Sequence, residues 1–277
     1  MESTKTVLIT GSSTGIGRET ALYFLEKGWN VAATMRTPEK SDLGSNSRLL
    51  PVRLDVTKEE SIKSAWEETT KKFAKIDVVV NNAGYGLTGP FEGASQEQIK
   101  RQFDTNVFGL MSLCQHAISV WRSSKQPGTL INITSVGGRV TFPYYSLYHS
   151  TKWAVEGFSE SLNYEVAPLG IKVKLVEPGA IRTDFGGRSA DHTDDNAPAE
   201  YQSILKIARN NIKKAVERSS EPIEVAKVIF EAAISNSSQL RYKAGSDAKL
   251  ILMLRKLVPE SVFFSIIQSQ VFKGAKI

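Results

Sequence analysis

Tyr148 and Lys152 form a candidate acid–base pair, because the segment Tyr-His-Ser-Thr-Lys separates them by four residues. If the chain is helical from Ser146 to about Pro168, the phenol and the ammonium project from one face, one turn apart. A free phenol has a pKa near ~10, and a fixed cation beside it moves that pKa toward neutrality. We therefore expect a centre that exchanges a proton with an alcohol or a ketone. Such a spacing also occurs by chance on surface helices, so other motifs must decide.

A glycine-rich turn follows the first apolar run, Val7 to Ile9, and leads into a helical pattern from Arg18 to Lys27. A strand that ends in such a turn lets the backbone approach a pyrophosphate, whose charge the helix N-terminus favours. Its spacing, Gly-x-x-x-Gly-x-Gly, differs from the dinucleotide fingerprint Gly-x-Gly-x-x-Gly. Serine and threonine hydroxyls in the turn can donate to phosphate oxygens. The predicted cofactor-binding residues here are Gly11, Ser12, Ser13, Thr14, Gly15, Ile16 and Gly17.

Short apolar runs alternate with longer helical patterns along the chain, which predicts right-handed βαβ units. The expected fold is α/β: a doubly wound, seven-stranded parallel sheet of Rossmann type with helices on both faces, in a single domain of residues 1–277. Gly28 and Gly170 are expected just past helix ends. We place the strands near residues 5–10, 30–34, 49–54, 76–81, 129–134, 171–177 and 240–244.

The composition of the chain limits the kinds of partner and the cellular compartment that we expect for it. The 277 residues carry 35 basic and 29 acidic side chains, a net charge of +6, and form no known nucleic-acid module, so we expect no nucleic-acid partner. Cys114 is alone and its neighbours suggest a packed helix, which suits a reducing cytosol. No apolar run reaches the length that spans a bilayer. We predict a cytoplasmic protein without a transmembrane segment.

Two segments depart from the βα rhythm. Residues 184–218 begin with Gly, Ser, Asp and Pro and continue as an amphipathic stretch; we interpret them as a substrate loop or lid, the alternative being a surface loop without a role. Residues 246–277 read as a C-terminal flap of two apolar helices broken by Pro259. The flap could pack on the pocket, on a second subunit or peripherally on a membrane; we favour pocket and subunit packing.

Several motifs occur together in one order. The chain resembles the single-domain short-chain dehydrogenase/reductase family from residue 5 to about residue 245. The resemblance implies that Tyr148 exchanges the proton and that Ser135 donates a hydrogen bond to the reacting oxygen. It also implies that Lys152 lowers the phenol pKa and reaches the nicotinamide ribose, and that Asn106 holds a water linking Lys152 to solvent. The matching motifs are Thr10 to Gly17, Asn81-Asn-Ala-Gly84, Ser135, Tyr148-x-x-x-Lys152 and Pro178-Gly179.

The resemblance also extends the cofactor site. Asp55 would accept from the adenine amino group with help from the Val56 backbone; Thr57, with Glu60 three residues later, fits a helix N-cap better. Asn81 would stabilise the sheet. The remaining residues implied to contact the ribose or the nicotinamide are Asn82, Ala83, Gly84, Pro178, Gly179, Ile181 and Thr183, besides Tyr148 and Lys152.

The end of the second strand, Ala33 to Thr37, holds no acidic residue that would repel a ribose 2′-phosphate. Arg36 could instead form charge-assisted bonds to that phosphate, so we predict NADP(H) in preference to NAD(H). Some NADP-specific family members carry a basic residue where this chain has Thr14, which weakens the parallel.

These observations predict an NADP(H)-dependent carbonyl reductase or secondary-alcohol dehydrogenase, similar to hydroxysteroid and retinol dehydrogenase types. The partner would be a hydrophobic small-molecule ketone or alcohol, and the family default is a homodimer or homotetramer. Candidates for an apolar pocket are Phe91, Phe142, Tyr145 and Phe185.

The alternative from another class is an NAD(P)-binding sensor without turnover. Epimerase or dehydratase chemistry belongs to longer relatives with an added substrate domain. We interpret the histidines 116, 149 and 192 as bystanders, and we see no metal-binding cluster.

Overall fold

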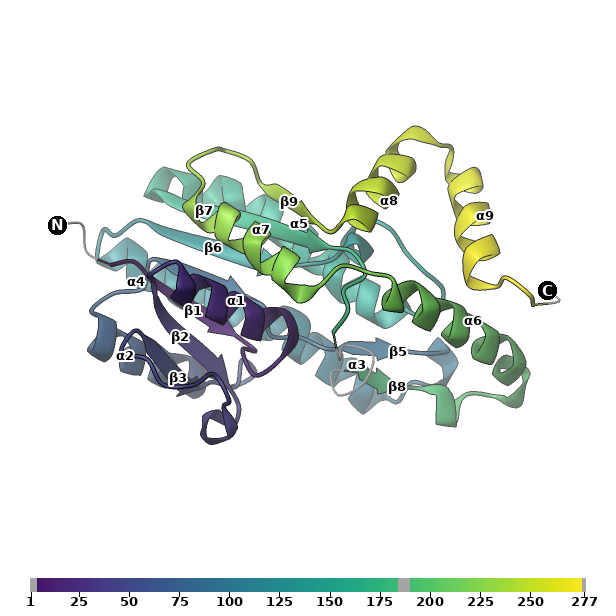
Figure 1. Cartoon of the computed structure of the whole chain (residues 1–277), viewed down its shortest axis with the longest axis horizontal. Coiled ribbons are helices and arrows are strands. Elements are labelled where there is room, and N and C mark those ends of the chain that lie inside the picture. The colour runs from purple at the N-terminus through teal and green to yellow at the C-terminus, as the bar shows by residue number, and fades with distance from the viewer. Residues whose placement is uncertain (1–3, 184–189, 276–277) are drawn as a thin grey trace.

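Seven strands of one sheet run parallel to their neighbours, in the order β3-β2-β1-β4-β6-β7-β9. They are seen in a computed structural model that describes residues 4–183 and 190–275 (Figure 1). This confirms the predicted doubly wound sheet. The strands are β1 (Thr6–Thr10), β2 (Asn30–Met35), β3 (Leu49–Arg53), β4 (Val78–Asn81), β6 (Gly128–Ile133), β7 (Ile171–Pro178) and β9 (Arg241–Ala244).

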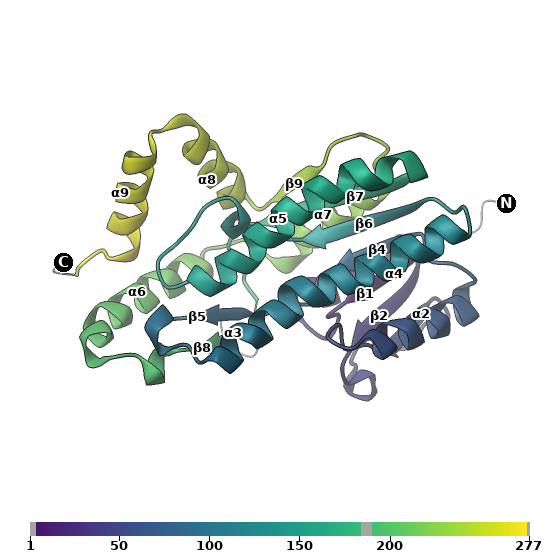
Figure 2. The same cartoon turned by 180° about the vertical axis from the view of Figure 1, so that it is seen from behind.

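Helices cover both faces of the sheet because its strands are apolar on both sides. In β1, Val7 and Ile9 join a core beneath α1 (Gly15–Glu26) and α7 (Pro222–Ile234), whereas Leu8 joins the opposite core. That opposite core lies under α2 (Glu59–Phe73), α4 (Gly109–Ser123) and α5 (Ser146–Val166), the helices facing the viewer in Figure 2. Gly28 and Gly170 lie just past helix ends as predicted, with φ of 82° and 72°.

The chain changes direction between β1 and β4, where the strand order reverses. In open α/β sheets such a switch point opens a crevice at the carboxyl ends of the strands, and ligands bind there. The glycine-rich turn follows β1 and Asn82 follows β4, so both lie at this edge. The fold therefore places the two predicted cofactor motifs side by side.

Three local features differ from the sequence-based expectation. A second, two-stranded parallel sheet, β5 (Gly86–Thr88) with β8 (Ala190–His192), was not predicted. A π-helical turn, Asp104–Phe108, connects α3 (Gln96–Phe103) to α4. The N-cap of α2 is Lys58, so the predicted capping box of Thr57 and Glu60 is wrong; Thr57 instead donates its N–H and hydroxyl to the Asp55 carboxylate.

The C-terminal helices project from one end of the molecule (Figure 1). Pro259 separates α8 (Ser246–Leu257) from α9 (Glu260–Val271), as predicted. The amphipathic stretch before them is α6 (Ala199–Glu217), whose Asn211 amide donates to the carbonyls of Val271 and Lys273 and so holds the end of α9. Of the described helices, none combines the length and the apolarity that crossing a membrane requires.

Candidate active site

The predicted acid–base residues meet at the carboxyl edge of the sheet. Helix α5 brings Tyr148 and Lys152 to one face, with the Lys152 Nζ 5.6 Å from the centroid of the Tyr148 ring. Ser135 follows β6 and is hydrogen-bonded to Tyr148. The Ser135 hydroxyl oxygen also accepts the Gly137 N–H at 3.0 Å, which fixes its position. Two hydroxyls thus converge on one point above a buried amine.

The electrostatics of this pair differ from the sequence-based prediction. Burial raises the pKa of the Tyr148 phenol, and the hydrogen bond from Ser135 offsets only part of that rise. Burial also lowers the pKa of Lys152 to about 8, although the Glu156 carboxylate opposes the change. The predicted lowering of the phenol pKa is therefore not seen for the protein by itself, because burial is the largest effect on that pKa. Tyr148 is a neutral proton donor at pH 7.

Lys152 is anchored to the sheet beneath the phenol. Its Nζ donates to the Ile133 carbonyl at 2.9 Å, and only 8% of the residue is exposed. Buried ammonium groups need such partners because desolvation disfavours their charge. The same contact holds the amine at the end of β6, two residues before Ser135. Lys152 therefore ties the catalytic helix to the strand that carries the second hydroxyl.

Asn106 lies in the π-helical turn beside this pair, and π-turns are frequent at functional sites. Its amide nitrogen donates to the Tyr85 carbonyl at 2.8 Å and to the Thr151 hydroxyl at 3.2 Å, and its oxygen accepts from the Tyr85 N–H at 3.1 Å. The side chain therefore fixes the segment after β4 against α5. The water that Asn106 is implied to hold stays a prediction.

The glycine-rich turn is tightly packed. A Cβ on Gly17 would lie 2.3 Å from the Gly11 carbonyl oxygen, and one on Gly11 would lie 3.0 Å from the Ala83 Cα. Asn82 binds the turn by donating from its amide to the carbonyls of Thr10 and Gly11. Only glycine allows this approach, so the turn brings backbone N–H groups to the crevice as a pyrophosphate requires.

Ser12 has a different position from the one expected. Its hydroxyl is fully buried and donates to the Ile9 carbonyl at 2.9 Å, so this hydroxyl shapes the turn and does not face a phosphate. At the start of α1, the described Thr14 side chain forms no capping hydrogen bond with the helix. The first N–H groups of α1 are therefore left to an anion, and the turn fits a dinucleotide.

The segment after β7 faces the glycine-rich turn across the crevice. Thr183 lies opposite Gly15, whose Cβ would be 3.5 Å from the Thr183 methyl group. Asp247, at the start of α8, accepts the Ala180 N–H at 2.6 Å and fills the space beside Gly179. Sequence reasoning missed Asp247, because nothing local connects it to a loop 67 residues earlier. It holds the Pro178 to Thr183 segment beside the predicted nicotinamide position.

The adenosine end of the site is open and basic. Arg36 is exposed and, within residues 4–183 and 190–275, its side chain forms no ion pair. Its neighbour Arg53 is occupied, donating to the Arg36 carbonyl and pairing with Glu39 at 3.0 Å. Asp55 uses one carboxylate oxygen for Thr57. Arg36 follows β2 and Asp55 follows β3, and their contacts with a 2′-phosphate and with adenine stay predictions.

A buried charge cluster lies beneath the catalytic residues and was missed by sequence reasoning. Glu156, one turn beyond Lys152, pairs with Arg241 of β9 at 2.9 Å, and Glu177 of β7 pairs with Arg139 at 3.2 Å. Both carboxylates are nearly fully buried. Burial, followed by repulsion from Glu177, raises the pKa of Glu156 to about 7. The cluster joins three segments that each carry a site residue: Ser135, Lys152 and Pro178.

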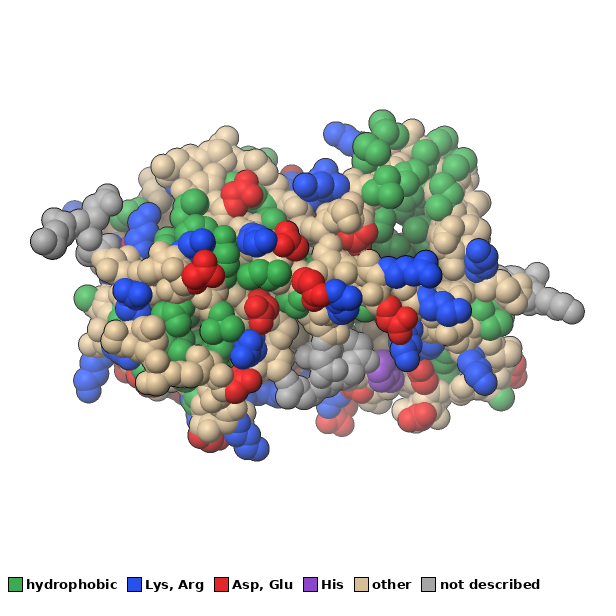
Figure 3. Space-filling view, in the orientation of Figure 1, with side chains coloured by type: hydrophobic (Ala, Val, Ile, Leu, Met, Phe, Trp, Pro, Cys, Tyr) green, Lys and Arg blue, Asp and Glu red, His purple; other side chains and the backbone are tan. Residues whose placement is uncertain are grey.

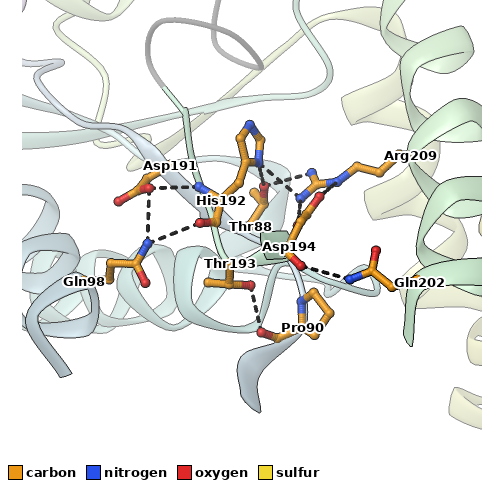
Figure 4. A network of polar contacts seen from close by, with 9 residues as sticks. All are labelled: Thr88, Pro90, Gln98, Asp191, His192, Thr193, Asp194, Gln202 and Arg209. Carbon is orange, nitrogen blue, oxygen red and sulfur yellow. Dashed lines mark hydrogen bonds and ion pairs between the residues drawn. The ribbon is translucent and has the colours of Figure 1, made fainter. Parts of the chain in front are cut away.

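Polar contacts hold the described part of the predicted lid, as Figure 4 shows. Arg209 of α6 binds the Asp194 carboxylate through two nitrogens, at 2.7 and 3.1 Å, and donates to the Thr88 hydroxyl at 2.9 Å. The Nδ1 of His192 lies 3.0 Å from that hydroxyl, so His192 belongs to this network. The network joins α6 and β8 to β5 at the rim of the site. Residues 184–189 lie outside the described part of the chain.

The candidates named for an apolar pocket have different surroundings, and the groove that one of them lines lies on the side of α5 that carries Ser146, His149 and Ser150, away from Tyr148 and Lys152. Phe91 is 61% exposed, and Phe185 lies outside the described residues. Tyr145 stacks on the buried His149 ring with centroids 5.5 Å apart, behind Tyr148. Phe142 lines a groove of about 620 Å³ between the start of α5 and α9, together with Tyr144, Trp153, Phe264 and Ile267.

Comparison with known proteins agrees with this geometry. A family model described as short chain dehydrogenase matches residues 5–194. A 3-ketodihydrosphingosine reductase of Bacteroides thetaiotaomicron is 34% identical, covering 90% of this chain and 91% of its own. A crystal structure of a short-chain dehydrogenase from Streptomyces avermitilis has a TM-score of 0.79 at 31% identity, covering 97% of each chain. ElxO, solved with NADP bound, has a TM-score of 0.71 at 30% identity, covering 87% of this chain and 97% of its own.

The charge cluster yields a stability prediction. Arg241 also lies 3.6 Å from Glu177, so Arg241→Met removes a cation from two buried carboxylates. We expect this to lower the free energy of unfolding by about 2 kcal/mol at pH 7.5, below the full buried-pair value because Arg241 is 27% exposed. The folded pKa of Glu156 lies above its ordinary 4.5, so its ionisation destabilises the folded state as pH rises toward about 7. The loss of unfolding free energy in Arg241→Met should therefore be smaller at pH 5 than at pH 7.5, and urea unfolding at both pH values measures it.

The matched control is Arg182→Met, which breaks the exposed pair with Glu221 and should change the free energy of unfolding by no more than about 0.5 kcal/mol. If Arg241→Met lowers the free energy of unfolding equally at both pH values, then the Arg241 side chain stabilises the fold by packing and not by its charge.

Proposed function

This chain belongs to the short-chain dehydrogenase/reductase family and is an oxidoreductase of the CH–OH group, and we propose that it interconverts hydrophobic ketones and secondary alcohols with NADP(H). The proposal rests above all on the two hydroxyls of Ser135 and Tyr148, which are hydrogen-bonded at the carboxyl edge of the sheet above the buried Lys152. A carbonyl oxygen placed between these hydroxyls meets two donors. The glycine-rich turn and the Thr183 segment border the same crevice.

The three catalytic side chains have separate roles, and that of the Lys152 ammonium is to stabilise the phenolate that forms as Tyr148 gives up its proton. In reduction, Tyr148 gives its proton to the carbonyl oxygen, and Ser135 donates a hydrogen bond to that oxygen as charge develops on it. In oxidation, Tyr148 takes the proton of the alcohol. The dinucleotide supplies the hydride when bound. Because burial keeps the phenol protonated at neutral pH, the resting enzyme is ready for reduction.

Arg36 supports the preference for NADP(H). It is the exposed guanidinium at the end of β2, and its neighbour Arg53 is engaged by Glu39. A guanidinium binds phosphate through charge-assisted hydrogen bonds, and an acidic residue that would select NAD(H) does not follow β2. ElxO, 30% identical to this chain, binds NADP.

The substrate class is supported by one relative and by the aromatic ring of Tyr145, whose centroid lies 6.3 Å from that of the Tyr148 ring. The Bacteroides relative is named for the reduction of 3-ketodihydrosphingosine, a ketone. We propose that residues 184–218 cover such a substrate, held at their described end by Arg209. A cytoplasmic homodimer or homotetramer stays our prediction.

The first prediction on function concerns Tyr148. Tyr148→Phe removes the proton donor while keeping the ring, so kcat for ketone reduction should fall at least about a hundredfold with NADPH affinity unchanged. Absorbance of the nicotinamide measures turnover, and fluorescence titration measures binding. Tyr145→Phe, 6.3 Å away between ring centroids, is the matched control and should stay within about threefold. Binding of NADPH by wild type without turnover of any ketone in a broad panel would favour the sensor alternative.

A second prediction concerns cofactor choice. Arg36→Asp replaces the expected phosphate ligand with a charge that repels it, so kcat/KM with NADPH should fall at least about tenfold while that with NADH holds or rises. Lys40→Asp changes a nearby exposed cation and should leave the ratio unaltered. An unchanged NADPH preference in Arg36→Asp would contradict the assignment of Arg36.

A third prediction uses the pH dependence of reduction. The Glu156 carboxylate raises the pKa of Lys152. We expect loss of the Lys152 proton near pH 8 to cause the fall of kcat/KM at alkaline pH. In Glu156→Gln this fall should therefore occur at a pH lower by about half a unit or more. Because the Glu156 pKa is about 7, the variant should match wild type at pH 6.

Glu160→Gln is the control for that shift, since Glu160 shares Arg241 but is exposed. An alkaline limb at the wild-type position in Glu156→Gln would show that the carboxylate does not act on Lys152.

A further inference from the structure

The C-terminal helices bury only part of their apolar surface: Ile251 and Leu254 of α8 and Ile267 of α9 are partly buried against a cluster with Val136, whereas other large apolar side chains stay exposed. Ala248 is the buried residue of α8, and Phe263 and Val271 are those of α9. Large side chains remain open to solvent on both helices: Leu250, Met253, Leu257, Val262, Phe264 and Ile266 are between 37% and 72% exposed. Helices of this length are marginal in water without packing of an apolar face. This surface therefore calls for a covering partner.

The exposed side chains of α8 form a stripe. Leu250, Met253 and Leu257 follow the i, i+3, i+7 spacing, which places them on one side of the helix. By the same helical geometry, Lys249 and Lys256 lie along the edge of that stripe. An apolar stripe bordered by lysines is the pattern of helices that rest in the interface of a bilayer.

Positive charge gathers around this surface. Residues 199–218 and 246–273 contain nine basic and four acidic residues, a net +5 against +6 for the whole chain. Figure 3 shows hydrophobic side chains over α8 and α9 with Lys and Arg side chains over α6 beside them. In the described part of the chain, six exposed lysines of these segments form no ion pair: 206, 213, 214, 249, 256 and 273. Such a surface complements an anionic one.

A second copy of the chain fits this surface poorly. A symmetric pair presents the same patch on both sides, so it would bring the two sets of lysines together. A nucleic acid would match the charge but leave the apolar stripe uncovered. An anionic lipid bilayer satisfies both, because headgroups attract the lysines and the acyl boundary receives the apolar side chains.

We propose that α8 and α9 dock the protein peripherally on an anionic membrane surface. The groove of about 620 Å³ beneath α9 adds to this surface, and its rim carries Trp153, which is 50% exposed. An amphipathic ring at this position suits the headgroup region. The docking needs no hydride transfer, so it is independent of the proposed reaction.

Co-sedimentation with vesicles tests the proposal. Wild type should sediment with phosphatidylcholine vesicles that contain about one quarter phosphatidylserine, and far less with phosphatidylcholine alone or at high salt. Met253→Gln/Leu257→Gln should weaken binding at least about tenfold by removing the stripe, and Lys249→Glu/Lys256→Glu should do the same by reversing charge. Tyr148→Phe should bind as wild type does, which separates docking from catalysis.

The matched controls are Leu169→Gln, a 44% exposed apolar residue beyond the end of α5, and Lys71→Glu on α2; both should sediment as wild type does. Protein that stays in the supernatant with both vesicle types overturns the proposal. A dimer in analytical ultracentrifugation that Met253→Gln/Leu257→Gln dissociates would also overturn it and would assign the surface to a second copy.

Discussion

The rest of the site depends on keeping one ammonium group charged inside the protein. Lys152 is buried, and burial lowers its pKa to about 8 although the Glu156 carboxylate, one helical turn away, opposes the change. The Ile133 carbonyl accepts a hydrogen bond from the buried amine. Glu156 is itself buried and needs Arg241, which comes from the last strand of the sheet. The charge of Lys152 therefore depends on three elements: the backbone of β6, Glu156 of α5 and Arg241 of β9.

This dependence explains which features the sequence could predict. Strands, helix ends and the Tyr148–Lys152 pair follow from short-range patterns, namely alternation, glycine at positive φ and a four-residue spacing. The pairing of Glu156 with Arg241 joins residues 85 positions apart, and Asp247 reaches back 67 positions to Ala180. No local pattern marks such contacts, because each residue alone is typical of a solvated surface. The direction of the Tyr148 pKa shift could not be predicted from the sequence for the same reason, because it depends on how deeply the phenol is buried.

The glycine-rich turn shows how polar residues near a ligand site divide their tasks. Sequence reasoning treated the Ser12 hydroxyl as a phosphate donor, but it closes the turn on the Ile9 carbonyl, and Asn82 closes it from the other side. Backbone polar groups in a tight turn must be satisfied before the turn can be rigid. These internal contacts fix the backbone of the turn. The proposed contacts with a pyrophosphate therefore fall to backbone N–H groups and not to the Ser12 hydroxyl.

Helix α6 connects the substrate rim to the C-terminal surface. Arg209 holds Asp194 and Thr88 at the rim, and Asn211, two residues later, holds the end of α9. A force that moved α9 would therefore act on the helix that holds Asp194 and Thr88. Helices α8 and α9 also pack on Val136 and Val140, just after Ser135, and Asp247 of α8 binds the Ala180 N–H. Because these contacts reach both α6 and the turn that carries Ser135, contact of α8 and α9 with a surface would act on elements that border the acid–base centre.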